Sequence, residues 1–252
     1  MEIISINITK GGCGKTTTVQ MMGEILSKYH KKRVLCIDTD PQCDLSIVSG
    51  INFMEQEHNL YTLLKGDSTL EECIVKSKYY DIIPGSLLLA YADTEFNQRG
   101  REYLLKERIK NADYDAILID SPPALGLMNI MSLTASTKVI IPAECSYLAM
   151  VGLNKLYNTL KSVHMHSNKD LCIAGILLIK YNGRININNT VLESLEKLAI
   201  QMNTKVFDSK IRETAKIKEA QSLQSPIIDW APYCTAASDY RKFVKEFIRN
   251  LA

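Results

Sequence analysis

The sequence lacks the features that mark a membrane-spanning or secreted protein. It contains no run of about 18 consecutive apolar residues, the length that a helix needs to cross a bilayer. Its first residues, MEIISINITKGG, do not show the basic and then apolar layout of a signal peptide. The seven cysteines form no CxxC pair and have no metal-ligand spacing to any of the four histidines. We therefore expect a cytoplasmic protein with reduced thiols packed in or near its core.

Positive and negative charges nearly balance over the 252 residues, but they are unevenly distributed along the chain. The formal net charge is +2. Residues 1–154 hold 15 Lys and Arg against 19 Asp and Glu, whereas residues 155–252 hold 15 against 9. A basic C-terminal part is suited to nucleic acid or acidic lipid, although a solvated basic surface is the ordinary alternative. The surplus alone leaves both interpretations open.

Short apolar, β-branched runs alternate with longer amphipathic segments along the chain. This alternation predicts an α/β fold with a mostly parallel, twisted sheet and helices on both faces. No repeat, low-complexity tract or linker interrupts it, so residues 1–252 are predicted to form one domain. Strands are predicted at residues 3–8, 34–38, 81–84, 116–120, 139–142 and 173–179, and near Val206. Helices are predicted at residues 15–29, 86–96, 101–111, 125–135, 151–164, 187–202 and 236–250.

The stretch INITKGGCGKTTTVQMM (6–22) nearly matches the phosphate-binding pattern G-x-x-x-x-G-K-[ST], with Thr9 at the first glycine position. It follows a predicted strand and opens a predicted helix, the context that a P-loop NTPase requires. The glycines allow successive N–H groups to turn toward a polyphosphate, and the helix adds its positive N-terminal end. The nucleotide-binding segment therefore comprises Lys10, Gly11, Gly12, Cys13, Gly14, Lys15, Thr16 and Thr17.

Three of these residues have specific predicted roles toward ATP and Mg²⁺. Lys15 is expected to neutralise the β- and γ-phosphates, and the Thr16 hydroxyl to bind Mg²⁺. Thr17 is expected to reach the α-phosphate. A second lysine, Lys10, stands five residues before Lys15, and the phosphate-loop pattern by itself does not explain it.

Carboxylates follow two of the predicted strands. In VLCIDTDPQ (34–42) the strand ends at Asp38, and Asp40 follows two residues later. In AILIDSPP (116–123) the strand ends at Asp120. Because ligands of a parallel sheet bind beyond the carboxyl ends of its strands, these residues should meet the loop at one edge. Asp120 and Asp38 are the metal candidates, and Asp40 is placed to orient the attacking water. The alternative for Asp38 and Asp40 is that each only caps the following turn.

Together, KGGCGKTT (10–17), DTDPQ (38–42) and DSPP (120–123) resemble the ParA/Soj branch of the ParA/MinD ATPases, the deviant-Walker-A partition proteins. The resemblance continues in three further stretches and so covers nearly the whole chain: YDIIPGSLLLAYADTEF (80–96), IIPAECSYLAMVGLNKL (140–156) and IKEAQSLQSPIIDWAP (217–232). It implies a P-loop ATPase fold and a slow ATP hydrolase with Lys10, Lys15 and Asp40 as its catalytic residues.

The resemblance also implies what the second lysine does. In this family the lysine at the position of Lys10 reaches across a two-fold interface to the phosphates held by the other subunit. ATP is then expected to produce a homodimer, and a ParB-like centromere-binding partner to stimulate hydrolysis.

The same family members bind double-stranded DNA without sequence preference. Arg184 in YNGR (181–184) and Lys216 fall where the family has DNA-binding cations. The resemblance thus implies a nucleoid-associated protein that partitions a chromosome or plasmid, with DNA binding that is sensitive to salt.

The chain departs from the family pattern in places. The family reads DPQGN where this chain reads DPQCD (40–44), and I-P-R-N where it reads IRET (211–214). The missing proline normally lines the adenine side, and Asn182 and Arg212 are the remaining candidates there. No segment precedes the first predicted strand, so neither an N-terminal helix-turn-helix extension nor specific operator binding is expected.

Two other functions are weighed against partitioning. A MinD-like membrane-associated positioning ATPase needs an amphipathic C-terminal helix, and YRKFVKEFIRNLA (240–252) has apolar residues on one face. A terminal helix packed on its own sheet has the same pattern, and we favour that interpretation and expect no membrane binding. A metabolic ligase would need a further substrate site, and the sequence shows no such constellation.

Overall fold

The computed structural model describes residues 1–182 and 187–251. Its strands are β1 (Glu2–Ile6), β2 (Val34–Asp38), β3 (Val75–Lys76), β4 (Asp81–Ile83), β5 (Ala116–Asp120), β6 (Lys138–Glu144), β7 (Cys172–Tyr181) and β8 (Val206–Arg212). In the described part of the chain they form one sheet in the order β3-β4-β2-β5-β1-β6-β7-β8. Each neighbouring pair is parallel except β3 and β4. The predicted α/β fold is confirmed.

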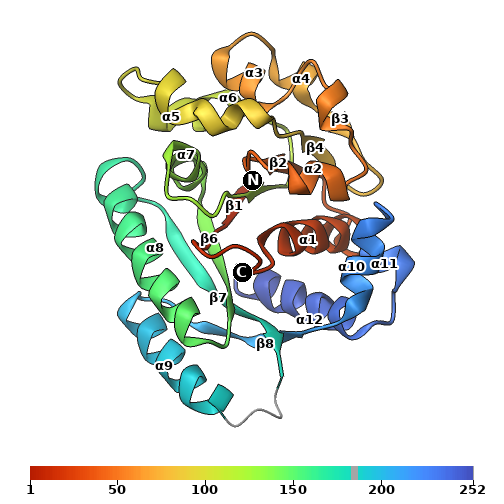
Figure 1. Ribbon diagram of the computed structural model, residues 1–252, viewed down its shortest axis with the longest axis vertical. Helices are drawn as coiled ribbons and strands as arrows, with labels where there is room; N and C mark the ends of the chain where they lie inside the picture. Colours follow the sequence, from red (N-terminus) through yellow and green to blue (C-terminus); the bar gives the residue numbers. More distant parts are fainter. Residues whose placement is uncertain (183–186, 252) are drawn as a thin grey trace.

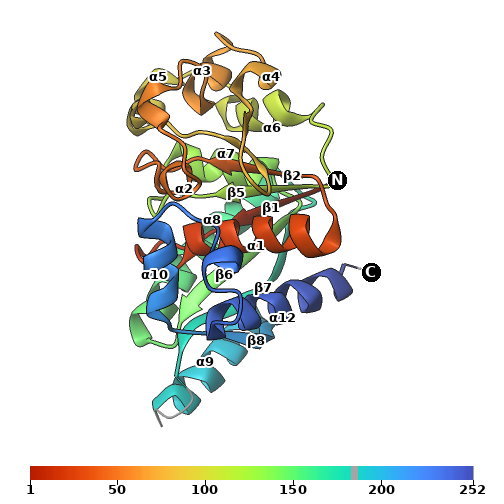
Figure 2. The same ribbon diagram turned by 90° about the vertical axis from the view of Figure 1, so that its right-hand side faces the viewer.

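Helices cover both faces of the sheet. Helices α1 and α12 lie on one face, and α7, α8 and α9 lie on the other (Figures 1 and 2). The α-helices are α1 (Lys15–His30), α2 (Asp44–Val48), α3 (Leu60–Lys65), α4 (Leu70–Cys73), α5 (Ala92–Glu95), α6 (Leu104–Ile109), α7 (Leu127–Ala135), α8 (Tyr147–His166), α9 (Ile187–Gln201), α10 (Ala215–Ser222), α11 (Ile227–Trp230) and α12 (Thr235–Arg249). The 3₁₀ helices are η1 (Phe53–Glu55), η2 (Leu87–Tyr91) and η3 (Arg101–Tyr103).

The central strands are the best-predicted part of the fold. Strands β2 and β5 have the predicted bounds, and every residue of both is buried. Strand β3 was not predicted, because a two-residue edge strand carries no readable pattern. All seven cysteines are free thiols; four are buried, and Cys172 is exposed, contrary to the expectation that all lie in or near the core.

Two of the helix predictions were wrong, because neither segment forms one continuous α-helix. Residues 86–96 form η2 and then α5, and residues 101–111 form η3 and then α6. Tight 3₁₀ turns are common where short helices begin, and they have the same apolar spacing as a first α-turn. Helix α8 also begins earlier than predicted, because Ser146 caps it by accepting a hydrogen bond from the Ala149 N–H.

The C-terminal helix α12 packs its apolar face into the core. The Phe243 ring meets the Phe207 ring edge-on at 5.0 Å between centroids, and the Tyr240 and Thr18 hydroxyls are 2.9 Å apart. Phe243 and Tyr240 are buried, whereas Lys242 on the opposite side is exposed. Within the described residues, no helix has both the length and the apolar character needed to cross a membrane. The packed-helix interpretation of the tail is therefore confirmed.

Phe243→Ala is expected to lower the free energy of unfolding by about 3 to 5 kcal/mol, because it opens a cavity against Phe207. Lys242→Ala on the exposed side is the matched control, with an expected change within about 0.5 kcal/mol. Urea denaturation followed by circular dichroism measures both. Equal stability of the two variants would show that this face of α12 is not packed.

Candidate nucleotide-binding site

The loop between β1 and α1 has the backbone geometry of a phosphate-binding loop. Gly12 and Gly14 take φ values of 71° and 65°, a left-handed conformation that glycine adopts without a steric penalty. A Cβ atom on Gly14 would also lie 3.0 Å from the Ile179 side chain. Helix α1 starts directly after Gly14, so its N-terminal N–H groups face the loop.

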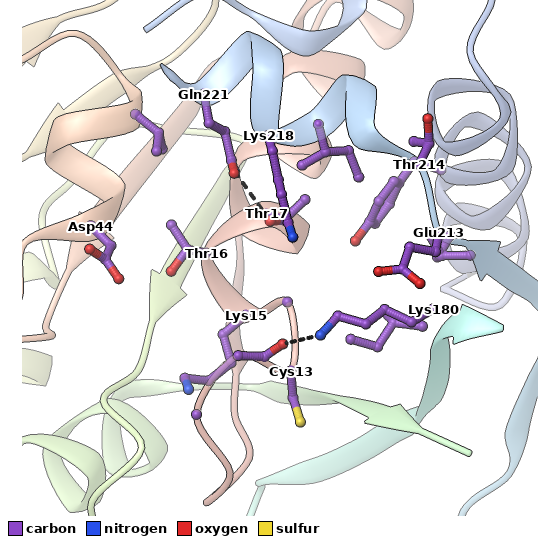
Figure 3. Close-up of a pocket in the computed structure, with 18 of the residues that line it drawn as sticks. Cys13, Lys15, Thr16, Thr17, Asp44, Lys180, Glu213, Thr214, Lys218 and Gln221 are labelled. Carbon is purple, nitrogen blue, oxygen red and sulfur yellow. Dashed lines mark hydrogen bonds between the residues drawn. The ribbon is translucent and has the colours of Figure 1, made fainter. Parts of the chain in front are cut away.

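A cavity of about 740 Å³ opens over this loop. The loop residues Gly11, Gly12, Cys13, Gly14, Lys15, Thr16 and Thr17 line it (Figure 3). Lys15 is 7% exposed, and its ammonium has no hydrogen-bond or ion-pair partner among the described residues. The Lys15 ammonium is not fully buried, and its unpaired positive charge at the cavity is suited to a phosphate.

Two buried carboxylates stand next to each other behind the loop. Strands β2 and β5 pair so that Asp38 lies opposite Asp120. Asp38 accepts hydrogen bonds from the Ser46 N–H at 2.8 Å and the Ser46 hydroxyl at 2.7 Å. Burial raises the pKa of both carboxyl groups, and the charge of Asp38 raises the pKa of Asp120 further. A cation beside this pair would stabilise its ionised form.

Thr16 and Asp120 fit a Mg²⁺ ion. The Thr16 hydroxyl donates to one Asp120 oxygen at 2.6 Å, whereas the buried Oδ1 has no hydrogen-bond partner among the described residues. Among all the described residues, no group of three or more His, Cys, Asp or Glu side chains could hold a metal by itself. This donor set matches Mg²⁺, which commonly uses one carboxylate together with the oxygens of a bound polyphosphate.

Asp40 both caps a turn and lines the cavity. It accepts a hydrogen bond from the Gln42 N–H at 3.0 Å, so the turn-capping alternative is realised alongside the exposure to the cavity. The next residues depart from the family pattern DPQGN. Cys43 adopts φ 57°, a left-handed conformation that glycine takes at lower cost.

The far end of the cavity is formed by β8 and α10. The residues lining it there are Ile211, Arg212, Glu213, Thr214, Ile217, Lys218 and Gln221, and Lys180 closes the side nearest the loop (Figure 3). Of this set, only Arg212 was predicted from the sequence to contact the nucleotide, and Lys218 was expected on the DNA-binding surface instead. The Gln221 amide donates to the Thr17 hydroxyl at 3.2 Å and so joins α10 to the phosphate loop.

Arg212 replaces the proline of the family pattern with an ion pair. Its guanidinium makes two hydrogen bonds of 2.8 Å to Asp239, and its backbone N–H makes a third at 3.1 Å to the same carboxylate. Asp239 is 5% exposed. Proline would fix this backbone through its ring, whereas here one buried carboxylate fixes both the backbone and the side chain.

Three predicted residues remain: Asn182, predicted for the nucleotide, and Lys216 and Arg184, predicted for DNA. Asn182 is exposed beyond β7 and is not among the described residues that line the cavity. Lys216 lies on the exposed side of α10 and pairs with Glu219 at 2.7 Å. Arg184 lies outside the described residues.

Lys10 does not line the cavity and is paired with Glu144. Its ammonium lies 2.6 Å from Glu144 Oε2, and Glu144 Oε1 lies 2.7 Å from the Lys180 ammonium. Lys180 also donates to the Gly12 carbonyl at 3.0 Å (Figure 3). Glu144 and Lys180 were not predicted from the sequence, although Glu144 ends β6 and Lys180 nearly ends β7 at the ligand-binding edge.

Comparison with known proteins identifies relatives over the full chain. A family model described as an AAA domain matches residues 1–173. The sporulation initiation inhibitor protein Soj of Bacillus subtilis is 37% identical, covering 99% of both chains. The chromosome partitioning protein ParA of Caulobacter vibrioides is 30% identical over 98% of this chain and 94% of its own. A Mycobacterium smegmatis structure described as cobyrinic acid a,c-diamide synthase with bound ADP and magnesium is 28% identical with a TM-score of 0.86, covering 100% of this chain and 95% of its own.

Lys15→Ala is expected to weaken nucleotide binding by at least about 30-fold, since losing one partner of a buried charge contact costs about 2 to 5 kcal/mol. Lys28→Ala is the control, because Lys28 lies on the same helix but pairs with Asp229 away from the cavity. Titration with a fluorescent ATP analogue measures both variants. Comparable affinity of Lys15→Ala and the unmodified protein would mean that Lys15 does not face the phosphates.

Proposed function

Because the chain belongs to the ParA/Soj-type ATPases of the ParA/MinD family, we propose that it partitions a chromosome or plasmid by dimerising with ATP on DNA. As a member of this family it is an ATP hydrolase that uses Mg²⁺. One observation carries the proposal: the phosphate loop has Lys15 in the wall of its own cavity and a second lysine, Lys10, that does not line it and pairs with Glu144. A cation beside the loop that does not face its own ligand is placed to serve another molecule's ligand.

The residues of one chain supply binding, charge and water positioning. Lys15 and the loop N–H groups would hold the triphosphate, and Thr16 and Asp120 would hold Mg²⁺. When bound, the ion neutralises charge on the phosphate oxygens. Asp40, at the cavity wall, would orient the attacking water and accept its proton.

Slow turnover follows from the state of the cavity arginine. Among the described residues that line the cavity, Arg212 is the only arginine, and its guanidinium is bound to Asp239. Among the described residues that line the cavity, no arginine is therefore free to stabilise charge that develops on the γ-phosphate. This supports a slow ATPase that a ParB-like partner stimulates.

Exposed apolar side chains at the ligand-binding edge support pairing of two copies. They lie on segments that directly follow β4, β5 and β6, the side of the sheet that carries the phosphate loop. Face-to-face pairing would cover these side chains and bring two cavities together. The residues are Leu87, Leu88, Tyr91, Leu125, Tyr147, Leu148 and Val151.

Cations on β8 and α10 support non-specific DNA binding. Lys210 and Lys216 lie on this segment within the basic part of the chain, and Lys216 is exposed, whereas Lys218 lines the cavity. Such lysines contact phosphates and carry no base preference. A nucleoid-associated location in the cytoplasm follows if the dimer binds DNA in this way.

The MinD-like alternative is less well supported. It requires the apolar face of the C-terminal helix to enter a membrane, whereas Tyr240, Phe243 and Phe247 of α12 are buried in the protein core. Membrane attachment through this helix would require its apolar face to leave the core.

Asp40→Ala is expected to keep ATP bound and to hold the dimer on DNA, because the water-positioning group is lost while the phosphate contacts remain. Gel shifts on unrelated duplexes, with no nucleotide, ADP or ATP, measure retention at low and high salt. Retention should require ATP and fall steeply with salt. Adding Lys216→Glu should weaken retention without changing ATP affinity. A protein that ignores DNA in all three nucleotide states contradicts the proposal.

Lys10→Ala is expected to bind ATP within about twofold of the unmodified protein yet to remain monomeric, because Lys10 does not line its own cavity. Light scattering with ATP measures the mass. Lys110→Ala, at an exposed lysine on the far side of the chain from the loop, serves as the control and should dimerise normally. ATP-dependent dimers of Lys10→Ala would refute the role of Lys10 across the interface.

A further inference from the structure

Lys10, the lysine proposed to bind a partner's phosphates, is already paired with Glu144 in the single chain. The Lys10 ammonium and Glu144 Oε2 are 2.6 Å apart. We infer that Glu144 is a positioning residue that keeps Lys10 on its own chain until a second copy's triphosphate draws it away, and that Lys180 then retains Glu144. This inference rests on the proposed ATP-dependent pairing. It adds that Glu144 and Lys180 set how strongly a partner's ligand must attract Lys10 before the dimer forms.

The geometry gives each Glu144 oxygen its own cation. Oε2 accepts from Lys10, and Oε1 accepts from Lys180 at 2.7 Å. Lys180 makes a further hydrogen bond of 3.0 Å to the Gly12 carbonyl in the phosphate loop. Glu144 therefore connects β6 to the loop through one lysine and to β7 through the other.

The contact is sheltered enough to hold Lys10. The side chains of Lys10 and Glu144 are 32% and 22% exposed. Their hydrogen bond raises the pKa of Lys10, and hydrogen bonds from both lysines lower the pKa of Glu144 against the opposing effect of burial. A charge-assisted hydrogen bond of this kind is stronger than an exposed ion pair.

Lys180 determines what remains once Lys10 has left. Glu144 is the last residue of β6, at the edge where a partner's triphosphate would arrive. An unpaired carboxylate there would repel the incoming phosphates, whereas a Glu144–Lys180 pair is neutral. Lys180 reaches this position with φ 49°, a left-handed conformation that is costly for a residue with a side chain. In this conformation the Lys180 ammonium lies within hydrogen-bond distance of both Glu144 and the Gly12 carbonyl.

The arrangement gives pairing a dependence on ligand charge. A partner's ligand must attract Lys10 more strongly than Glu144 does, in both halves of the dimer. A triphosphate carries more charge than a diphosphate, so the threshold favours ATP over ADP.

The test measures the dimer dissociation constant in ATP by analytical ultracentrifugation, with Asp40→Ala present in every protein to block hydrolysis. Glu144→Gln keeps the shape but removes the charge, and it should tighten the dimer about tenfold, since hydrogen bonds to charged groups contribute about 1.5 to 3 kcal/mol. Without nucleotide it should remain monomeric. Glu144→Ala should act in the same direction, and Glu107→Gln, from the exposed pair with Lys110, should change nothing.

Lys180→Met should have the opposite effect and weaken the dimer about tenfold, because Glu144 then holds Lys10 alone and is left unpaired on its release. Combined with Glu144→Gln it should have no further effect, since Lys180 acts through Glu144. Because Lys180 lines the cavity, all dimer dissociation constants are compared at saturating ATP. ATP affinity of the dilute monomer should stay within about twofold for the two Glu144 variants.

Three results would overturn the inference. They are a Glu144→Gln dimer no tighter than its parent, an additive effect of Lys180→Met in the double variant, and a loss of ATP affinity that accounts for the Lys180→Met effect. If the Asp40→Ala parent itself stays monomeric in ATP, the proposed function fails instead, so the two failures are distinguishable.

Discussion

The site depends on the parallel register of β5 with its two neighbours. Asp120 lies opposite Ile6, where β1 ends and the phosphate loop begins, and opposite Asp38 at the end of β2. This register places the Asp120 carboxylate beside the Thr16 hydroxyl at 2.6 Å. A shift of one residue would turn the Asp120 side chain to the other face of the sheet. The loop sequence alone therefore does not make the site; the pairing of three buried strands does.

The parts that were predictable share one property: each is encoded within a few consecutive residues. Strands β2 and β5 are continuous apolar runs because both faces are buried, and each ends in an aspartate. The loop glycines, Lys15 and Thr16 are fixed by the spacing of one motif. Since parallel strands present their carboxyl ends at one edge, these local features suffice to locate the phosphate end of the cavity.

The parts that were missed depend on contacts between distant segments. Glu144 ends β6 and Lys180 lies in β7, and neither sequence neighbourhood indicates that both meet Lys10. Arg212 was named for the base pocket because of its position, but its guanidinium is bound to Asp239 from α12. Propensity and motif spacing do not report such pairings, since they arise only when strands and helices have docked.

The distribution of these contacts separates the cations of the site by role. Lys10 and Lys180 share Glu144, and Arg212 is held by Asp239, so two internal carboxylates already pair with three of them. Lys15 has no such partner among the described residues, which leaves its charge for the ligand of its own cavity. A cation that is paired with a carboxylate binds a phosphate only after leaving that carboxylate, whereas an unpaired cation binds at once. In the proposed function this difference sets the order of events: the chain would fill its own cavity first, and a second copy would be needed before Lys10 leaves Glu144.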